Sequence, residues 1–81
     1  MARALTRAQS ERRSAILERL RAVDQAIPDQ LRSYLAHDKS IFITVDTVQA
    51  DLRAMEKAGT VRRGHRTWAS GTYWGLGDAT T

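Results

Sequence analysis

The positions of glycine and proline divide this chain into two parts of different character. All five glycines lie at or after Gly59, and the one proline is Pro28. Glycine and proline are the residues that most strongly interrupt regular structure. Long helices are therefore expected before Gly59, and strands and turns are expected after it. At 81 residues the chain fits one domain with a small apolar core.

Two helices are predicted in the first half of the chain. Residues 6–26 begin with a capping box, in which Thr6 and Gln9 satisfy the first free backbone N–H groups. Apolar residues then recur at helical spacing: Ile16, Leu17, Leu20, Val23 and Ile27. Pro28 suits the first turn of a second helix over residues 28–36, with Leu31, Tyr34 and Leu35 on one face.

A third helix is predicted over residues 45–58, after a polar loop at residues 37–40. Thr44 is its expected N-cap, and Gly59 fits the left-handed position that ends a helix. Three apolar residues recur at helical spacing within it: Val48, Leu52 and Met55. The short run that precedes the cap is expected to tuck apolar side chains under this helix: Ile41, Phe42 and Ile43.

The remaining residues predict a β-hairpin. Residues 60–63 and 72–74 are β-prone, and residues 64–71 between them are rich in turn formers, which predicts a long tip. Tyr73, Trp74 and Leu76 are expected to close the core. The predicted fold class is mainly α with a small β-hairpin. Residues 1–9 are interpreted as a basic arm and the start of the first helix, 10–76 as the domain, and 77–81 as a flexible tail.

Three helices followed by a hairpin is the layout of a winged helix-turn-helix domain. Residues 43–61 resemble the recognition helix of DeoR-type regulators. The family pattern is an apolar residue before a Ser or Thr cap, then Thr-Val, Asp-Leu, an apolar residue followed by Glu, and a glycine that ends the helix. In this chain the pattern is matched by Ile43-Thr44, Thr47-Val48, Asp51-Leu52, Met55-Glu56 and Gly59. The arginine repressor DNA-binding domain is similar over about residues 14–76, including an extended connection before the third helix and a closing strand like Gly71-Thr72-Tyr73. The resemblance implies a three-helix winged helix-turn-helix that binds double-stranded DNA. It implies no effector or regulated pathway.

The face of the third helix opposite its apolar stripe is polar. A helix fits the major groove of B-DNA, where Gln pairs well with adenine, Arg with guanine, and Ala or a Thr methyl with the thymine methyl. The candidate DNA contacts of this recognition helix are Thr44, Asp46, Thr47, Gln49, Ala50 and Arg53. The alternative is that the same residues form an ordinary solvated helix face.

The hairpin has the strongest charge feature. The chain has a net charge of +4, which favours anionic partners but also occurs in ordinary soluble proteins. No acidic residue lies between Glu56 and Asp78, so a basic wing at residues 62–68 would add salt-dependent affinity for phosphates. Its candidate contacts are Arg62, Arg63, His65, Arg66, Thr67 and Trp68. The alternatives are a solvated loop and, for Trp68, packing on its own hairpin rather than stacking on a base.

The N-terminal region also contains several cations, and three interpretations of them stay open. In the first, these residues contact phosphates or the minor groove of DNA; in the second, the first helix pairs two subunits; in the third, they form a solvated face beside Glu11 and Glu18. The cations are Arg3, Arg7, Arg12 and Arg13.

Enzymatic, metal-binding and membrane functions are not expected. There is no cysteine, and His37 and His65 are far apart with no ligand motif, so neither a metal nor a cofactor is predicted. His37 and Asp38 resemble a catalytic pair but lie in a predicted loop without a nucleophile. No apolar run approaches the roughly 20 residues of a membrane span, and no signal peptide is visible, which predicts a soluble cytoplasmic protein.

The sequence therefore favours a small bacterial or phage transcriptional regulator, a repressor that binds double-stranded DNA sequence-specifically. A homodimer is expected, because regulators of this type commonly bind two half-sites. Two alternatives remain. The same fold could bind a protein partner, for example to inhibit a host protein, because fold alone does not decide function. The wing and Trp68 could also bind DNA without sequence preference.

Overall fold

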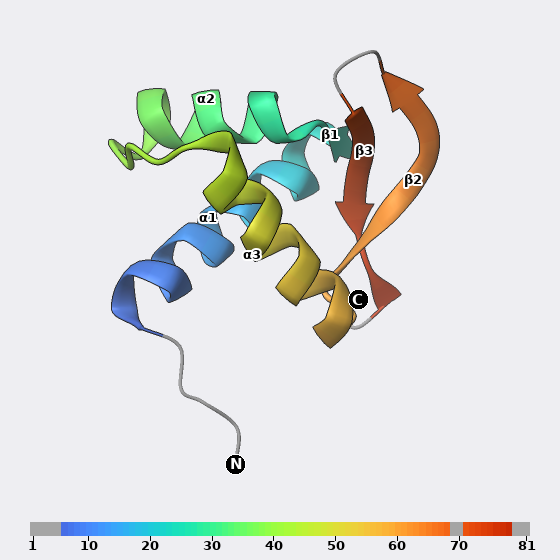
Figure 1. The fold of residues 1–81 in the computed structure, drawn as a ribbon, viewed down its shortest axis with the longest axis horizontal. Coiled ribbons are helices and arrows are strands. Elements are labelled where there is room, and N and C mark those ends of the chain that lie inside the picture. Colours follow the sequence, from blue (N-terminus) through green and yellow to red (C-terminus); the bar gives the residue numbers. More distant parts are fainter. Residues whose placement is uncertain (1–5, 69–70, 79–81) are drawn as a thin grey trace.

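Three helices pack against a small antiparallel sheet in the computed structural model, which describes residues 6–68 and 71–78 and, for residues 65–68 and 71, only the backbone. The elements are α1 (Arg7–Val23), β1 (Gln25–Ala26), α2 (Pro28–Asp38), α3 (Val45–Ala58), β2 (Val61–Trp68) and β3 (Gly71–Leu76). The helices gather on one side and the hairpin of β2 and β3 lies on the other (Figure 1). The predicted class, mainly α with a small antiparallel β part, is confirmed.

The first helix begins as predicted and ends earlier. The Gln9 N–H donates to the Thr6 hydroxyl at 3.1 Å, and the Thr6 N–H donates to Gln9 Oε1 at 3.0 Å, so the capping box is confirmed. The predicted end at Ala26 is wrong, because α1 stops at Val23 and Asp24 takes a positive φ of 72°. Aspartate tolerates this region better than most residues, since its short polar side chain compensates locally.

A third strand joins the hairpin and was not predicted. β1 pairs antiparallel with β3, with Gln25 opposite Gly75 and Ala26 opposite Trp74, and the strand order is β1-β3-β2. The helical spacing of apolar residues up to Ile27 extends the predicted first helix over residues 24–26. Their extended conformation depends on pairing with a strand about 50 residues further along the chain.

The second helix is longer than predicted. Pro28 occupies its first turn as expected, and the Ile27 N–H donates to Gln30 Oε1 at 3.2 Å. The helix continues through His37 and Asp38, so the prediction that these two residues form a loop is wrong. Neither residue breaks a helix, and a histidine in the last turn suits the negative end of the helix dipole.

The connection between α2 and α3 is only partly as expected. Ile41 and Ile43 are half-buried and pack against the core, as predicted. Phe42 between them is 79% exposed, so the expectation that it is tucked under the next helix is wrong. In an extended segment neighbouring side chains point in opposite directions, and the two isoleucines leave Phe42 facing solvent.

The bounds of α3 agree with the prediction, whereas the structure of the hairpin that follows differs from the prediction. Gly59 ends α3 with a left-handed φ of 83°. β2 then runs to Trp68, with a register shift between Arg63 and Thr67, so the predicted long tip at residues 64–71 is wrong. Residues 69–70 connect the strands and lie outside the described part of the chain.

Gly77, which was predicted to begin a flexible tail, is held in place by the fold. This glycine is buried, and its N–H donates to the Thr60 carbonyl oxygen at 2.9 Å. The bond fastens the end of β3 to the turn between α3 and β2. The prediction of a flexible tail is therefore wrong for Gly77, while residues 79–81 lie outside the described residues.

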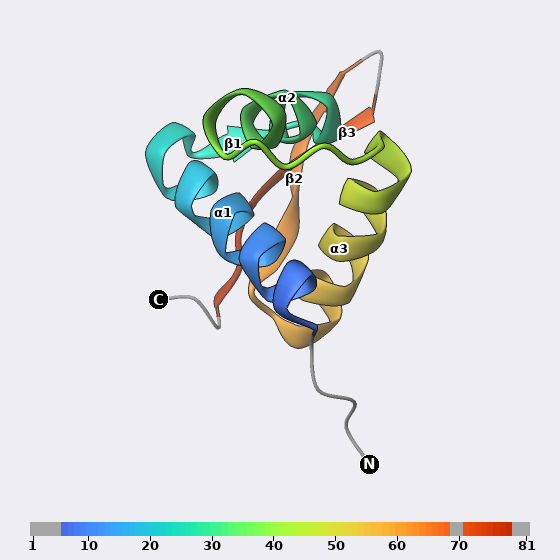
Figure 2. The same cartoon turned by 90° about the vertical axis from the view of Figure 1, so that its left-hand side faces the viewer.

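One apolar core lies between the helices and the sheet. In the view of Figure 2, α1 and α3 lie on two sides, α2 lies above and the strands lie behind. Trp74 is buried and Leu76 packs against the core as predicted, while Tyr73 is only half-buried. Among the described helices, none is long and apolar enough to cross a membrane. The buried core consists of Ala15, Ile16, Leu20, Ala26, Leu31, Leu35, Val48, Leu52, Met55, Val61 and Trp74.

Candidate nucleic-acid interface

The polar face of α3 points away from the core. Val48, Leu52 and Met55 are at most 3% exposed, which fixes the rotation of the helix about its axis. The residues singled out on the opposite face are exposed (Asp46, Ala50 and Arg53) or half-buried (Thr47 and Gln49).

A buried carboxylate anchors α3 to α1. Asp51 is 2% exposed, and its Oδ2 accepts from Arg12 Nε at 2.7 Å while its Oδ1 accepts from Arg12 Nη2 at 3.3 Å and from Arg13 Nε at 3.1 Å. Charge-assisted bonds of this kind are stronger than neutral ones and hold the two helices in a defined orientation.

Sequence reasoning missed this cluster, although a signal was present. Asp51 follows Val48 by three residues and precedes Met55 by four, which is the spacing of the buried face. The side chains of Arg12 and Arg13 are only 15% and 20% exposed and face Asp51. The interpretation of these two arginines as part of a solvated face is therefore wrong.

One groove joins α3 to the hairpin. It has a volume of about 170 Å³, and its walls come from the start of α2 and from α3, β2 and β3. Three sequence-predicted candidates lie together in it: Gln49, Arg53 and Arg63. Three further residues were not predicted, because neither the strand register nor the position of α2 beside the hairpin could be known from the sequence: Pro28, Thr72 and Trp74.

Arg63 is held in this groove by two neighbours. Its Nε lies 3.3 Å from Glu56 Oε2, and its guanidinium lies 5.2 Å from the centre of the Trp74 ring. The side chain remains 55% exposed, so the cation is oriented but accessible to a ligand. Arg53 beside it makes no ion pair with any described residue.

Arg62 points to the other face of the sheet. Successive side chains of a strand alternate between faces. Arg62 accordingly lines a separate hollow of about 240 Å³ with Arg21, Asp24 and Gln25. The two adjacent arginines, predicted to act together, are therefore divided between opposite faces.

Thr44 acts first as a helix cap. Its hydroxyl accepts from the Thr47 N–H at 3.3 Å and lies 3.2 Å from the Thr47 hydroxyl. Thr44 is exposed and Thr47 is half-buried, and both lie at the start of α3.

The outer part of the predicted wing is described only by its backbone. Residues 65–68 continue β2 beyond the groove, and Thr67 pairs with Thr72. The side chains of the remaining wing candidates lie outside the described residues: His65, Arg66, Thr67 and Trp68.

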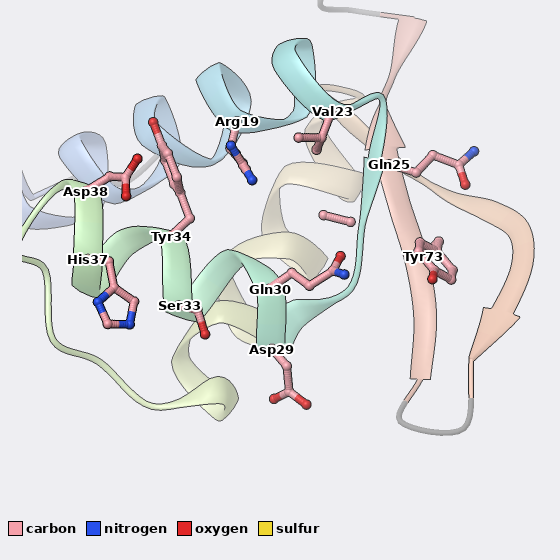
Figure 3. Close-up of a pocket in the computed structure, with 11 residues that line it drawn as sticks. Arg19, Val23, Gln25, Asp29, Gln30, Ser33, Tyr34, His37, Asp38 and Tyr73 are labelled. Carbon is pink, nitrogen blue, oxygen red and sulfur yellow. The ribbon is translucent and has the colours of Figure 1, made fainter.

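A larger hollow of about 560 Å³ lies between α1, α2 and β3 (Figure 3). Figure 3 shows His37 and Asp38 diverging from the last turn of α2, and Tyr73 facing the hollow from β3. Successive helical residues point about 100° apart, so this pair does not converge on a common point. Among the described residues, no group of three or more potential metal ligands is found.

The chain was compared with family models, curated proteins and solved structures, and no match was found in any of the three. The resemblance to DeoR-type regulators and to the arginine repressor DNA-binding domain therefore stays a prediction from the sequence.

Proposed function

We propose that this chain binds double-stranded DNA sequence-specifically as a winged helix-turn-helix, in a small bacterial or phage regulator that acts as a repressor. In this proposal α3 lies in the major groove and the hairpin follows the phosphate backbone. A helix with its side chains is about 10–12 Å wide, and the major groove is about 12 Å wide.

The observation that supports the proposal best is the shared groove. Gln49 and Arg53, which suit base edges, lie beside Arg63, which suits a phosphate. Helix and hairpin thus offer base-reading and backbone-binding groups on one continuous surface.

The charges on this surface also support the proposal. The Asp51 charge is buried and balanced by two arginines, and the Glu56 charge is paired with Arg63. Arg53 and Lys57 are exposed on the same helix, against the single exposed acid Asp46. The surface presented to a ligand is therefore more positive than the sequence of α3 suggests.

Replacing Arg63 with alanine is expected to weaken binding to all duplexes and to lower the salt dependence. Each lost phosphate contact reduces the slope of log K against log salt by about 1. The measurement is fluorescence anisotropy of a random pool of short duplexes at several salt concentrations. Arg62→Ala is the matched control, because it removes the same charge from the opposite face. Equal slopes for the two variants would mean that the groove does not bind the backbone.

Replacing Arg53 with alanine is expected to relax the base preference at one position of the bound site. A good contact between arginine and guanine provides about 1–3 kcal/mol of discrimination. The measurement is the base composition of duplexes enriched from a random pool by each variant. Lys57→Ala is the control, since it removes a cation from the same helix outside the groove. Unchanged preference in Arg53→Ala would show that α3 does not read bases at this position.

The alternative function, binding of a protein partner, predicts a different result when the chain is purified from its cells. A stoichiometric protein partner that co-purifies with the chain, without DNA and without affinity for the duplex pool, would support that alternative.

A further inference from the structure

Arg19 on α1 is a cation that the fold holds against an aromatic ring without giving it a carboxylate partner. Its guanidinium lies 5.0 Å from the centre of the Tyr34 ring, and the residue is half-buried. It forms no ion pair with any residue in the described part of the chain.

The second cation beside this ring is already engaged. Lys39 Nζ lies 5.9 Å from the centre of the Tyr34 ring and 3.1 Å from Glu18 Oε2. The hydrogen bond to the Glu18 carboxylate raises the pKa of Lys39 above its usual value. Of the two cations, Arg19 is therefore the one whose charge is available to a ligand.

Arg19 lies in the wall of the hollow of about 560 Å³ between α1, α2 and β3. Buried Ala26, half-buried Val23 and the rings of Tyr34 and Tyr73 provide the apolar part of the wall. Figure 3 shows Arg19 and Val23 extending from α1 toward α2, while Tyr73 faces the hollow from β3. Sites for small organic molecules have volumes of about 300–1,000 Å³ and combine an apolar lining with a few polar groups. The hollow has the size and the lining of such a site.

We infer that this hollow binds a small aromatic carboxylate. A planar guanidinium donates two parallel N–H bonds to a carboxylate, so Arg19 is suited to hold the acid group. The aromatic ring of the ligand would lie among Val23, Ala26 and Tyr73, where it gains apolar contact and offset stacking.

The acids at the edge of the hollow favour a ligand with one negative charge over a ligand with two. Asp29 lies in the first turn of α2 and Asp38 is the last residue of this helix, and both are exposed and line the hollow. Their charges repel an anion. A phosphate ester carries about 1.5–2 negative charges at pH 7, so it loses more to this repulsion than a carboxylate does.

The hollow is separate from the groove between α3 and the hairpin. No residue of the described chain lines both. Thr72 and Trp74 of β3 line the groove, whereas Tyr73 between them lines the hollow, as the alternation of side chains along a strand requires. The inference therefore goes beyond the proposed function and does not rest on it.

The test is a chemical-shift titration of the ¹⁵N-labelled chain, without DNA, using three probes that share one ring system. Naphthalene-2-carboxylate is expected to bind with a dissociation constant of about 1 mM or lower. The amide signals that move are expected to be those of residues around the hollow. Naphthalene-2-carboxamide has the same ring without the charge, and 2-naphthyl phosphate has the ring with a larger charge. The carboxamide is expected to bind at least tenfold more weakly than the carboxylate, and the phosphate is expected to bind more weakly than the carboxylate.

Two variants assign the roles of charge and ring. Arg19→Gln keeps a long polar side chain and is expected to raise the dissociation constant of the carboxylate at least tenfold, while that of the carboxamide stays the same. Tyr73→Ser is expected to weaken both. Arg21→Gln removes the same charge from an exposed position of α1 outside the hollow and is expected to have no effect. The same spectra show whether each variant is folded.

Three results would overturn the inference. The first is a wild-type chain whose signals around the hollow do not move with the carboxylate up to about 10 mM. The second is Arg19→Gln that is folded and binds the carboxylate like the wild type, or that weakens the carboxylate and the carboxamide equally. The third is tighter binding of the phosphate than of the carboxylate. Because no DNA is present, binding of the carboxylate by a chain that binds no duplex contradicts the proposed function alone.

Discussion

Replacing Asp51 with alanine is expected to lower the free energy of unfolding by about 3 kcal/mol, because it removes the partner of two nearly buried guanidinium groups. Domains of this size are stable by only about 5–15 kcal/mol, so this loss is a large fraction of the total. The measurement is urea unfolding, with a lower midpoint and an unchanged slope.

Asp46→Ala provides the control for this prediction. It is the same substitution in the same helix, but at an exposed position in the first turn. Its expected cost is that of a favourable dipole interaction, about 0.3–1 kcal/mol. Similar losses for the two variants would mean that the contact between Asp51 and α1 contributes little to stability.

Replacing Gly77 with alanine is expected to destabilise the protein by about 3 kcal/mol, from steric overlap. The added Cβ would lie 2.2 Å from the Gly59 carbonyl oxygen and 3.0 Å from the Val61 backbone nitrogen. Both atoms belong to the backbone at the turn between α3 and β2, which cannot move aside as a flexible side chain can. The measurement is thermal unfolding, where about 1 kcal/mol corresponds to roughly 4–8 °C in a domain of this length.

Gly75→Ala is the comparison for Gly77→Ala. Its added Cβ would lie 3.3 Å from the Asp24 carbonyl oxygen and 3.6 Å from Gln25 Cγ, which requires only a small adjustment. Its expected cost is about 1 kcal/mol or less. If Gly77→Ala unfolds at the same temperature as Gly75→Ala, the packing of the chain end against the turn is looser than described.

The parts of the fold that were predictable have local causes. The third helix has its cap, its apolar spacing and its terminating glycine within Thr44–Gly59, and each could be recognised without knowledge of the rest of the chain. The capping box of α1 and the position of Pro28 are local in the same way. For this reason the helix bounds were correct at these points.

The parts that were missed depend on contacts between distant residues. β1 is extended only because β3 lies beside it, and the division of Arg62 from Arg63 depends on which face of the sheet each occupies. The partners of Asp51 lie 38 and 39 residues away, so the sequence could place this carboxylate on the buried face but could not name what neutralises it.

The candidate site also consists of a part that could be predicted from local sequence and a part that depends on contacts between distant residues. The exposed face of α3 could be assigned from helical spacing, since its opposite is apolar. The groove could not, because it is formed by α2, α3 and both strands of the hairpin.

Selection of bound duplexes from a random pool by the wild-type chain, followed by fluorescence anisotropy of the selected duplex at increasing salt, is the first test of sequence-specific DNA binding. We expect one sequence to be enriched, with an affinity that falls as salt rises, by a slope of about 0.9 for each phosphate contact. Absence of binding to any duplex, even at low salt, would contradict the proposed function.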